Sequence, residues 1–415
     1  MMILNNTVPP SAATVNSNPA FSLPYVQIGL ETGQSAWEMD VNSPVPDLFD
    51  RTHHLFKGGL TCASSRTLYE IEQIATAARQ HDLPVYVVYE AGAFGQKLGR
   101  DISRAGGSPV QLVARNIEYV RFGTKQQDVP KTDRIDSQRQ SHIPLDHPDL
   151  PYADVQTEQE ESLRNLFKEK KRLEKSIHRL NAQMCAHLRS CHIGLRHCSV
   201  PVWETRFEEL SGLSSSKRHC LENQLSELKD VTEKHQIIIK LLLALAKEVT
   251  DNWQPPAPEA QPTEPGRHSL QALGENSPLR EQSLPQALLE IKGIGSKTML
   301  TILALVGDPR RFKNKKAFRA YMALAPTPYR SCTIRKSLGM KRGNPDLRKL
   351  MIQLAWRWCS MHPDTHLAQK YLPKLTGSRR SKKIAVCALA GELAEMLYTH
   401  LVHGKEIAGL NKEEH

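Results

Sequence analysis

The sequence predicts an α/β domain followed by a chain that is otherwise helical. Apolar runs typical of strands alternate with helix-like patterns over residues 24–150, whereas apolar residues between 157 and 250 follow a heptad-like spacing. A segment rich in Pro, Gln, Glu and Ser at 252–286 has the composition of a solvated linker. It precedes a compact, helix-like region at 287–405, so the 415 residues are expected to form several domains.

Local patterns predict the elements of the α/β domain. Residues 1–23 are rich in Asn, Ser and Pro and contain no Lys or Arg, so we expect them to be disordered and not to act as a signal peptide. Two strand-like runs joined by a Thr32-Gly33 turn predict a hairpin. Strand–helix alternation after that hairpin predicts a mixed sheet of the ribonuclease H type. The predicted ranges are Tyr25–Leu30, Ala36–Val41, Leu68–Ala78, Val85–Tyr89, Phe94–Ala105 and Val110–Val113.

The heptad-like spacing runs from Leu166 to Leu188 and again from Leu221 to Leu245. Two such stripes around a break predict an antiparallel coiled-coil hairpin, or the arms of a dimer. Near the predicted tip, Cys and His residues are frequent, but they lack the paired spacing of zinc ligands, and a solvated tip is the favoured interpretation over a zinc site. These residues are Cys185, His187, Cys191, His192, His197 and Cys198.

Four carboxylates of the α/β domain are candidate ligands of Mg²⁺. Glu31 ends the first predicted strand, and Glu90 ends a central one, where α/β sheets present functional groups. Asp133 and Asp136 lie three residues apart at a predicted helix start, on one face of its first turn, with Thr132 as the expected cap. Converging carboxylates repel one another unless a hard cation neutralises them, and paired ions can activate a nucleophile.

A purely structural interpretation of these acids remains open. Acidic residues are common at helix starts, so Asp133 and Asp136 fit a cap and a surface position as well as a metal site. An acid at the end of an apolar strand, such as Glu90, has less structural purpose. Lys131 and Arg134 either contact phosphate or balance the aspartates.

Basic charge is concentrated between Arg311 and Leu350. Twelve Lys or Arg residues face one acid there, an excess that equals the net charge of +11 for the whole chain. Such an electrostatic footprint is typical of a protein that binds a polyanion. Ser331 lies within it, in a predicted loop that follows two prolines. The candidate phosphate-binding residues are Arg330, Arg335, Lys336, Lys341, Arg342, Asn344 and Arg348.

Ser331 needs a base or a metal to become a nucleophile, and no His lies near it in the sequence. Its activator would therefore come from another domain or subunit; the alternative is a DNA- or RNA-binding loop with an incidental serine. The Gly293-Ile294-Gly295 turn fits a phosphate-binding helix–hairpin–helix element or an ordinary helix junction. Trp356 and Trp358 are expected in the core.

Size and composition set the class of protein and its compartment. The longest apolar run, Ile237–Ala246, is shorter than the ~20 residues of a membrane span and contains Lys240, so no membrane partner is expected. The eight cysteines have no framework spacing, which is typical of reduced thiols in a cytoplasm. A cytoplasmic protein is the resulting expectation.

In combination these segments resemble the DEDD-type transposases of the insertion-sequence one-ten family, especially its eleven-eleven branch, which is related to the Piv DNA invertases. Val-Val-Tyr-Glu-Ala-Gly-Ala-Phe-Gly at 87–95 and Lys-Thr-Asp-Arg-Ile-Asp-Ser at 131–137 match the N-terminal RuvC-like motifs. The C-terminal transposase motifs are matched by Gly293-Ile294-Gly295, Gly307-Asp308 to Arg311-Phe312, Leu324 to Ser331, and Gly343-Asn344 to Leu347-Arg348.

The resemblance implies an RNA-guided DNA recombinase. A RuvC-like domain binds Mg²⁺ through Glu31, Glu90, Asp133 and Asp136, and Ser331 attacks DNA to form a phosphoserine intermediate. A guide RNA, the bridge RNA, pairs with donor and target DNA. Homodimers pair into a homotetramer, with the site formed between subunits.

Two departures from the family pattern define the alternatives. The first acid is normally Asp but is Glu31 here, and the residue after Ser331 is normally Gly but is Cys332, while the loop before Gly343 is one residue shorter. A catalytically impaired descendant that still binds nucleic acid is therefore one rival. A RuvC-like junction nuclease, with Ser331 incidental, is the other.

Overall fold

The computed structural model describes residues 25–113, 132–145, 153–253 and 273–405, apart from short gaps within these ranges. The gaps are residues 46–47, 50–51, 93, 144, 195, 209, 211–212, 327, 332–333, 338–339 and 341, and the side chains at 328–331, 334–337 and 380 are also outside the description. The expectations for residues 1–23, for most of the linker at 252–286, and for Lys131 and Lys341 fall outside the described residues. The described part forms two compact units, one up to Val155 and one from Gln156 onward.

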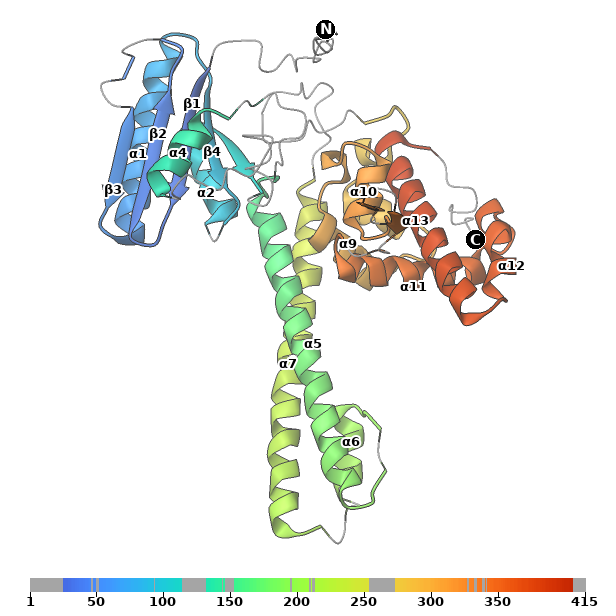
Figure 1. Cartoon of the computed structure of the whole chain (residues 1–415). Coiled ribbons are helices and arrows are strands. Elements are labelled where there is room, and N and C mark those ends of the chain that lie inside the picture. The colour runs from blue at the N-terminus through green and yellow to red at the C-terminus, as the bar shows by residue number, and fades with distance from the viewer. Residues whose placement is uncertain are drawn as a thin grey trace, which may run out of the picture. The chain divides into compact units, whose positions relative to one another are not determined.

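A five-stranded mixed sheet forms the first unit (Figure 1). Its order is β3-β2-β1-β4-β5, in which β1, β2 and β3 are antiparallel neighbours while β4 and β5 run parallel to β1. The predicted mixed α/β sheet is therefore confirmed. The strands are β1 Val26–Thr32, β2 Ala36–Asn42, β3 His53–Lys57, β4 Val85–Glu90 and β5 Ser108–Leu112.

Helices cover both faces of this sheet. Helices α1 (Gly59–Arg79) and α2 (Gly95–Arg104) supply apolar side chains to one face, where they share a core with alternate residues of the strands such as Ile28 and Val87. Helix α4 (Asp133–Ser141) packs on the opposite face against β1 and β2. The alternation of side chains along each strand lets the same sheet bury apolar groups on both sides.

The position of α4 depends on Gly29 in β1. A Cβ atom at Gly29 would lie 1.9 Å from the backbone oxygen of Ser137, so any larger residue would push the helix away. The buried Gln27 side chain then donates hydrogen bonds to the backbone oxygens of Gln140 (2.7 Å) and Ile143 (2.9 Å). Ser141 Oγ donates to Asp40 Oδ2 over 2.6 Å. Helix α4 is thus held tightly on the sheet.

Two long helices, α5 (Glu158–Arg189) and α7 (Ser215–Asp251), open the second unit and run side by side (Figure 1). They are antiparallel, because Gln159 hydrogen-bonds to Glu248 while Arg179, further along α5, pairs with Glu227. The predicted pairing of the two apolar stripes thus occurs within one chain. A short helix that the sequence did not predict, α6 (Val200–Glu208), packs at the tip.

The rest of the second unit is a helical domain whose large apolar core also receives Leu163 and Phe167 from α5 and Leu242 and Ala246 from α7. The sequence predicts that this domain is helical but does not predict the individual helices. They are α8 Leu284–Leu289, α9 Ser296–Val306, α10 Lys315–Tyr321, α11 Pro345–Met361, α12 His366–Leu375 and α13 Arg379–His403, with short 3₁₀ turns at Pro278–Arg280 and Pro309–Arg311.

One stretch of α13, Ser381–His403, is long and apolar enough by length and composition to cross a membrane. Just over half of its most apolar window is buried, and its leucines, among them Leu389, Leu393 and Leu397, lie in the core of the helical domain. Core packing therefore accounts for its apolar character.

Ser331 does not lie in an irregular loop, which corrects one expectation. It is the last residue of strand β6 (Pro328–Ser331), which pairs with β7 (Ile334–Ser337) as an antiparallel hairpin. Ser331 pairs with Ile334, and two residues separate the strands, a connection length typical of tight hairpins. The two prolines favour a loop, whereas Tyr329 and Ile334 are good strand formers.

Candidate functional site

The register of the sheet brings Glu31 and Glu90 together. Strands β1 and β4 are parallel, and Leu30 pairs with Tyr89 across them. The next residue of each strand is the glutamate, so both carboxylates leave the carboxyl edge of the sheet from neighbouring positions. Parallel strands with a common carboxyl edge are a frequent place for functional groups.

Helix α4 adds the two aspartates. Thr132 caps its start, because the Thr132 hydroxyl accepts a hydrogen bond from the Ile135 amide over 3.3 Å, as the sequence predicted. Asp133 and Asp136 therefore both lie in the first turn; Asp133 is exposed, whereas Asp136 is only 7% exposed. Close packing of α4 at Gly29 sets this first turn beside the end of β1.

The electrostatics of Glu31 reveal how close the four acids are. The pKa of Glu31 is raised to about 7, first by partial burial and then by the negative charges of Glu90, Asp136 and Asp133, against the opposing effect of a hydrogen bond from Gln140. That bond runs from Gln140 Nε2 to Glu31 Oε2 over 3.0 Å. We call Glu31, Glu90, Asp133 and Asp136 the acidic cluster. Its members interact although they come from two strands and a helix.

The donor chemistry of the acidic cluster fits a hard divalent cation. All four groups offer carboxylate oxygens, which Mg²⁺ and Ca²⁺ prefer, and their mutual repulsion is what a bound cation relieves. As the described side chains stand, no three His, Cys, Asp or Glu residues converge closely enough to hold a metal ion. Binding would therefore require rotamer changes of the glutamates and aspartates around the cation.

The sequence did not single out several polar residues that surround the acidic cluster. Glu38 of β2 lies directly opposite Glu31 in the antiparallel register, and His53 Nε2 is 3.6 Å from Glu38 Oε2. Gln140 and Arg139 of α4 contact Glu31 and Asp136 respectively, the latter over 3.6 Å. The sequence signals Arg139 and Gln140 only by their spacing, since they follow Asp136 by three and four residues on the same helix.

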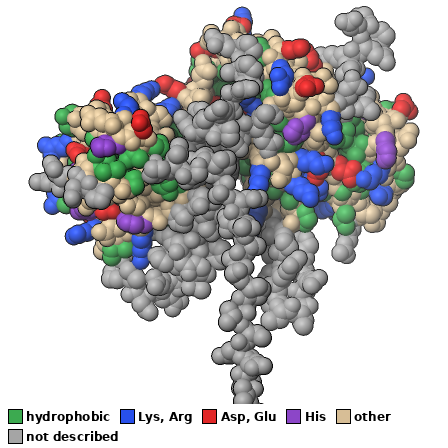
Figure 2. Space-filling view, turned by 90° about the horizontal axis from the view of Figure 1, so that it is seen from above, with side chains coloured by type: hydrophobic (Ala, Val, Ile, Leu, Met, Phe, Trp, Pro, Cys, Tyr) green, Lys and Arg blue, Asp and Glu red, His purple; other side chains and the backbone are tan. Residues whose placement is uncertain are grey.

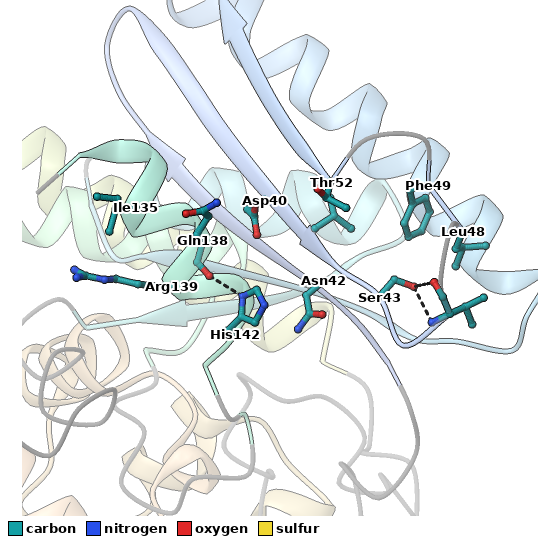
Figure 3. Close-up of a pocket in the computed structure, with 12 residues that line it drawn as sticks. Asp40, Asn42, Ser43, Leu48, Phe49, Thr52, Ile135, Gln138, Arg139 and His142 are labelled. Carbon is teal, nitrogen blue, oxygen red and sulfur yellow. Dashed lines mark hydrogen bonds between the residues drawn. The ribbon is translucent and has the colours of Figure 1, made fainter. Parts of the chain in front are cut away.

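A pocket of about 850 Å³ lies beside α4, between this helix and the segment that joins β2 to β3 (Figure 3). Arg139 lines it and also pairs with Asp136, so the pocket borders the acidic cluster. His142 donates a hydrogen bond from Nδ1 to the backbone oxygen of Gln138, and the buried Asp40 accepts one from Ser141. Polar groups on one wall and Leu48 and Phe49 on another give the pocket a mixed character.

The predicted phosphate-binding residues of the second unit lie around the β6–β7 hairpin and the start of α11. Arg330 pairs with Arg335 in the hairpin register, beside Lys336, and Arg342 is exposed. Several Lys and Arg side chains are visible on this unit, with acids between them (Figure 2). Arg134, on α4 of the first unit, is also exposed.

Two of these predicted residues have structural contacts. The Asn344 side chain caps α11, accepting hydrogen bonds from the amides of Asp346 (3.0 Å) and Leu347 (3.3 Å). The Arg348 guanidinium donates to the backbone oxygen of Met340. Gly343 is also structural, since its φ of +99° favours glycine and a Cβ there would lie 2.4 Å from the Ala320 oxygen. Phosphate binding by Asn344 and Arg348 stays a prediction.

The two tryptophans of α11 differ, which corrects a second expectation. Trp358 is 3% exposed and lies in the core as predicted, but Trp356 is 45% exposed. Residues two apart on a helix point to nearly opposite sides, so both cannot face the same core. The Gly293-Ile294-Gly295 turn does join two helices, α8 and α9, and Gly293 has a φ of +97° that favours glycine.

Of the Cys and His residues near the hairpin tip, Cys185 and Cys198 pack in the same small core as Trp203, whereas His192 and His197 are exposed. Cys185 is fully buried in a small apolar core, and Asn181 Oδ1 accepts hydrogen bonds from the Trp203 indole (2.8 Å) and the Cys198 amide (3.0 Å). Among the described residues there, no three His, Cys, Asp or Glu side chains form a group that could hold a metal ion.

The chain combines an α/β unit that has acids at one sheet edge with a helical unit that is rich in Lys and Arg. This distribution of charge is typical of the class of proteins that bind nucleic acid. Comparison with known proteins finds a similarity within the helical unit. Residues 285–371 match the family model of the IS116/IS110/IS902 transposases. These residues run from α8 into α12, and the matched domain therefore includes Ser331 and the start of α11.

Two curated relatives agree with this match. A putative transposase y4rJ of Sinorhizobium fredii is 37% identical over 132 residues, which is 31% of this chain and 33% of that protein. The transposase for insertion sequence element IS1328 of Yersinia enterocolitica is 29% identical over 129 residues, 30% of this chain and 38% of that protein. The predicted resemblance to this family is therefore confirmed over residues 285–371, which are similar to its transposase domain, and each alignment spans about a third of the relative.

Proposed function

We propose that this protein is the transposase of a mobile insertion sequence and that it cuts and joins DNA strands. The family match supports the action on DNA, and the sheet order β3-β2-β1-β4-β5 supports an RuvC-like assignment of the first unit. The observation that carries the proposal is the electrostatic coupling of Glu31 to Glu90, Asp136 and Asp133. Such a coupled, half-buried set of carboxylates is costly unless it serves a cation or a proton transfer.

The acidic cluster would hold Mg²⁺ through Glu31, Glu90, Asp133 and Asp136. A cation bound there lowers the pKa of a hydroxyl and stabilises a leaving oxygen of phosphate chemistry. Gln140 orients the Glu31 carboxylate through its hydrogen bond, and Arg139 orients Asp136. Without a cation, Glu31 with a pKa near 7 is protonated in about half of the molecules at neutral pH.

Ser331 is the proposed nucleophile. Its Oγ would form a bond to a DNA phosphorus while the P–O bond of the strand breaks, and the leaving oxygen would take up a proton. A hydroxyl of the second DNA would then attack the phosphoserine and restore the serine. The family resemblance supports this sequence of steps, together with guidance by a bridge RNA and assembly of homodimers into a homotetramer, in which Ser331 and the acidic cluster come from different subunits.

Trapping of a covalent protein–DNA adduct tests the proposal. The protein would be incubated with Mg²⁺, the RNA transcribed from the DNA beside its gene, and labelled DNA that carries both flanks of the gene. A labelled band at the mass of the protein on a denaturing gel is expected for the natural chain and for Ser337→Ala, a matched serine in β7. It is expected to disappear in Ser331→Ala, and an adduct that persists in Ser331→Ala would overturn the serine mechanism.

One observation favours a second candidate, hydrolysis by the first unit without a covalent step. The acidic cluster is built within the first unit alone, and its chemistry needs no serine. In that case Ser331→Ala would leave strand cleavage intact, whereas Asp133→Asn would abolish it. Absence of cleavage in the natural chain itself, with binding retained, would instead fit a protein that only binds nucleic acid.

A further inference from the structure

A second polar groove lies in the helical unit, and none of the residues that line it belongs to the predicted site. It has a volume of about 590 Å³ and is formed by α5, α9 and the exposed side of α11. The three helices lie beside one another in Figure 1, and α9 packs on both of the others. We call it the Trp356 groove, and the lining residues that matter here are Lys297, Thr298, Lys349, Gln353, Trp356 and Arg357.

Helical spacing places the α11 residues of the groove on one face. Lys349, Gln353 and Trp356 are separated by four and three residues, so their side chains lie one above the other, whereas Leu354 and Trp358 point into the core. All three groove residues are exposed. A large aromatic ring that a helix holds at 45% exposure between polar neighbours is a platform for stacking, since its face remains accessible.

The cations of the groove are not fully neutralised. Lys170 pairs with Glu174 over 2.6 Å and Lys171 with Asp346 over 3.0 Å, so those charges cancel. Over the described residues neither Lys297 nor Lys349 forms an ion pair. Arg357 donates only a 3.3 Å hydrogen bond to the Thr298 hydroxyl. Three positive charges beside Trp356 therefore lack a counter-charge, which favours an anionic ligand.

The start of α9 adds a further attraction for phosphate. Lys297 and Thr298 lie in its first turn, after the Gly293-Ile294-Gly295 turn, and Gly295 is the N-cap of this helix of 11 residues. No atom lies within 4 Å of where a Cβ of Gly295 would be, so a ligand can approach the backbone there. The amides of a first turn and the helix dipole favour an anion at this end.

We propose that the Trp356 groove binds a single-stranded segment of nucleic acid, with an unpaired base stacked on Trp356 and the adjoining phosphates on Lys297, Lys349 and Arg357. Gln353 lies at the position from which an amide can reach the edge of the stacked base. The combination of a cationic track with an aromatic platform is what sequence-tolerant binding of single strands requires. The proposal rests on the proposed function only for the source of the strand, which is either DNA opened during recombination or RNA.

Binding of oligonucleotides tests this assignment without any cleavage. The full-length protein would be titrated into fluorescent 12-nucleotide single-stranded DNA, the same sequence as RNA, and duplex DNA. Trp356→Ala is expected to weaken binding of the single strand by about 5- to 150-fold, the range found for loss of one stacked base, with Trp356→Phe restoring most of it. The tighter of the DNA and RNA strands identifies the source.

The contribution of the positive charges is tested separately from that of base stacking. Lys297→Ala combined with Lys349→Ala is expected to lower the slope of log affinity against log salt by about 1.4, because each lost phosphate contact on a single strand changes it by ~0.7. Tyr69→Ala, which removes a ring that is 61% exposed in the first unit, and Lys229→Ala, at the far end of the helical hairpin, are matched controls expected to bind as the natural chain does.

Two results would overturn the proposal. One is unchanged affinity for single-stranded DNA and RNA in Trp356→Ala with an unaltered circular dichroism spectrum. The other is equal loss in Tyr69→Ala. Failure of the proposed function would look different, since a Ser331→Ala protein that forms no adduct is still expected to bind the single strand with natural affinity.

Discussion

The acidic cluster of the sheet unit and the Trp356 groove of the helical unit carry unbalanced charges of opposite sign. The acids crowd together until the pKa of Glu31 reaches about 7, whereas Lys297 and Lys349 form no ion pair among the described residues. In the proposed function, the first site binds cations and the second binds anions. A nucleic acid accompanied by divalent cations supplies both, which is why the two surfaces together support action on a phosphate backbone better than either one alone.

The two regions also differ in how the chain holds them. Glu31 and Glu90 are positioned by strand register and Asp133 and Asp136 by a capped helix packed on Gly29, so the acidic cluster is rigidly built. The β6–β7 hairpin that carries Ser331 is a two-stranded element, and such a hairpin is only marginally stable by itself. We infer that the backbone that carries the acidic cluster is preorganised, whereas its carboxylates change rotamer when a cation binds.

The largest expected effect comes from removing one charge of the acidic cluster. Asp133→Asn keeps the size of the side chain and the Thr132 cap but removes a proposed ligand, so DNA cleavage is expected to fall by about 100- to 10,000-fold, the usual range for one proton-transfer or charge-stabilising group. Oligonucleotide affinity should be unchanged. Cleavage is measured on gels at saturating DNA.

Removal of one positive charge from the helical unit tests the same division of roles from the other side. Arg342→Ala in the basic segment is expected to weaken binding of DNA and to lower its salt dependence, while the rate at saturation stays close to natural. If Asp133→Asn weakened binding as much as Arg342→Ala does, the division of roles between the two units would be wrong.

A smaller effect is expected where the acidic cluster is held in place. Gly29→Ala introduces a Cβ that would lie 1.9 Å from the Ser137 oxygen, so α4 must move away from β1. Overpacking of this kind costs about 1–3 kcal/mol, read as faster amide hydrogen exchange in β1 and α4, and cleavage should fall with it. Gly194→Ala, which meets nothing within 4 Å, is the control. Natural exchange and cleavage in Gly29→Ala would mean that α4 does not need this close contact.

The smallest expected effect is the pH dependence that Glu31 confers. Its folded pKa of about 7 lies above the ordinary value of 4.5, so the native state holds an extra proton between these values and stability falls as pH rises through about 7. Because Glu31 is partly solvated, we expect a loss of only about 1–2 kcal/mol in the first unit between pH 5 and pH 8.

Glu31→Gln and Mg²⁺ test this pH effect. Hydrogen exchange in β1 and β4 should lose its difference between pH 5 and pH 8 in Glu31→Gln, because the amide does not titrate and can still accept the hydrogen bond from Gln140. Millimolar Mg²⁺ should reduce the difference in the natural chain, since a cation favours the ionised carboxylate. A pH effect of the same size in Glu31→Gln would assign it to another group.

Much of the architecture was predictable because local signals agreed with the fold. Strand runs and the Thr132 cap were found within one or two residues of their observed positions, and the two apolar stripes do pair as antiparallel helices. Strand β3 was missed because His53 and His54 begin a short edge strand with little apolar alternation. Helix α6 was missed because the hairpin tip contains Cys, His and Pro that obscure its period.

The side-chain environments were predicted less well. Trp356 was expected in the core, and its exposure depends on which face of α11 meets α9, a question of packing between segments distant in sequence. Glu38, Gln140 and Arg139 joined the surroundings of the acidic cluster only because β2 and α4 converge on β1. Ser331 is expected in a loop because the two prolines before it outweigh the strand signals of Tyr329 and Ile334, whereas the structure pairs it with Ile334.

The sequence by itself determined the identity and spacing of the charged groups, the periodicity of the helices and strands, and the motifs that carry the family resemblance. Those features are local, since they depend on bonds and side chains a few residues apart. Only the tertiary structure decided that Gly29 lets α4 approach β1, that four acids share one electrostatic environment, and that Trp356 faces outward beside Lys297 and Lys349. These outcomes depend on distances between remote segments, which close packing sets and no local pattern records.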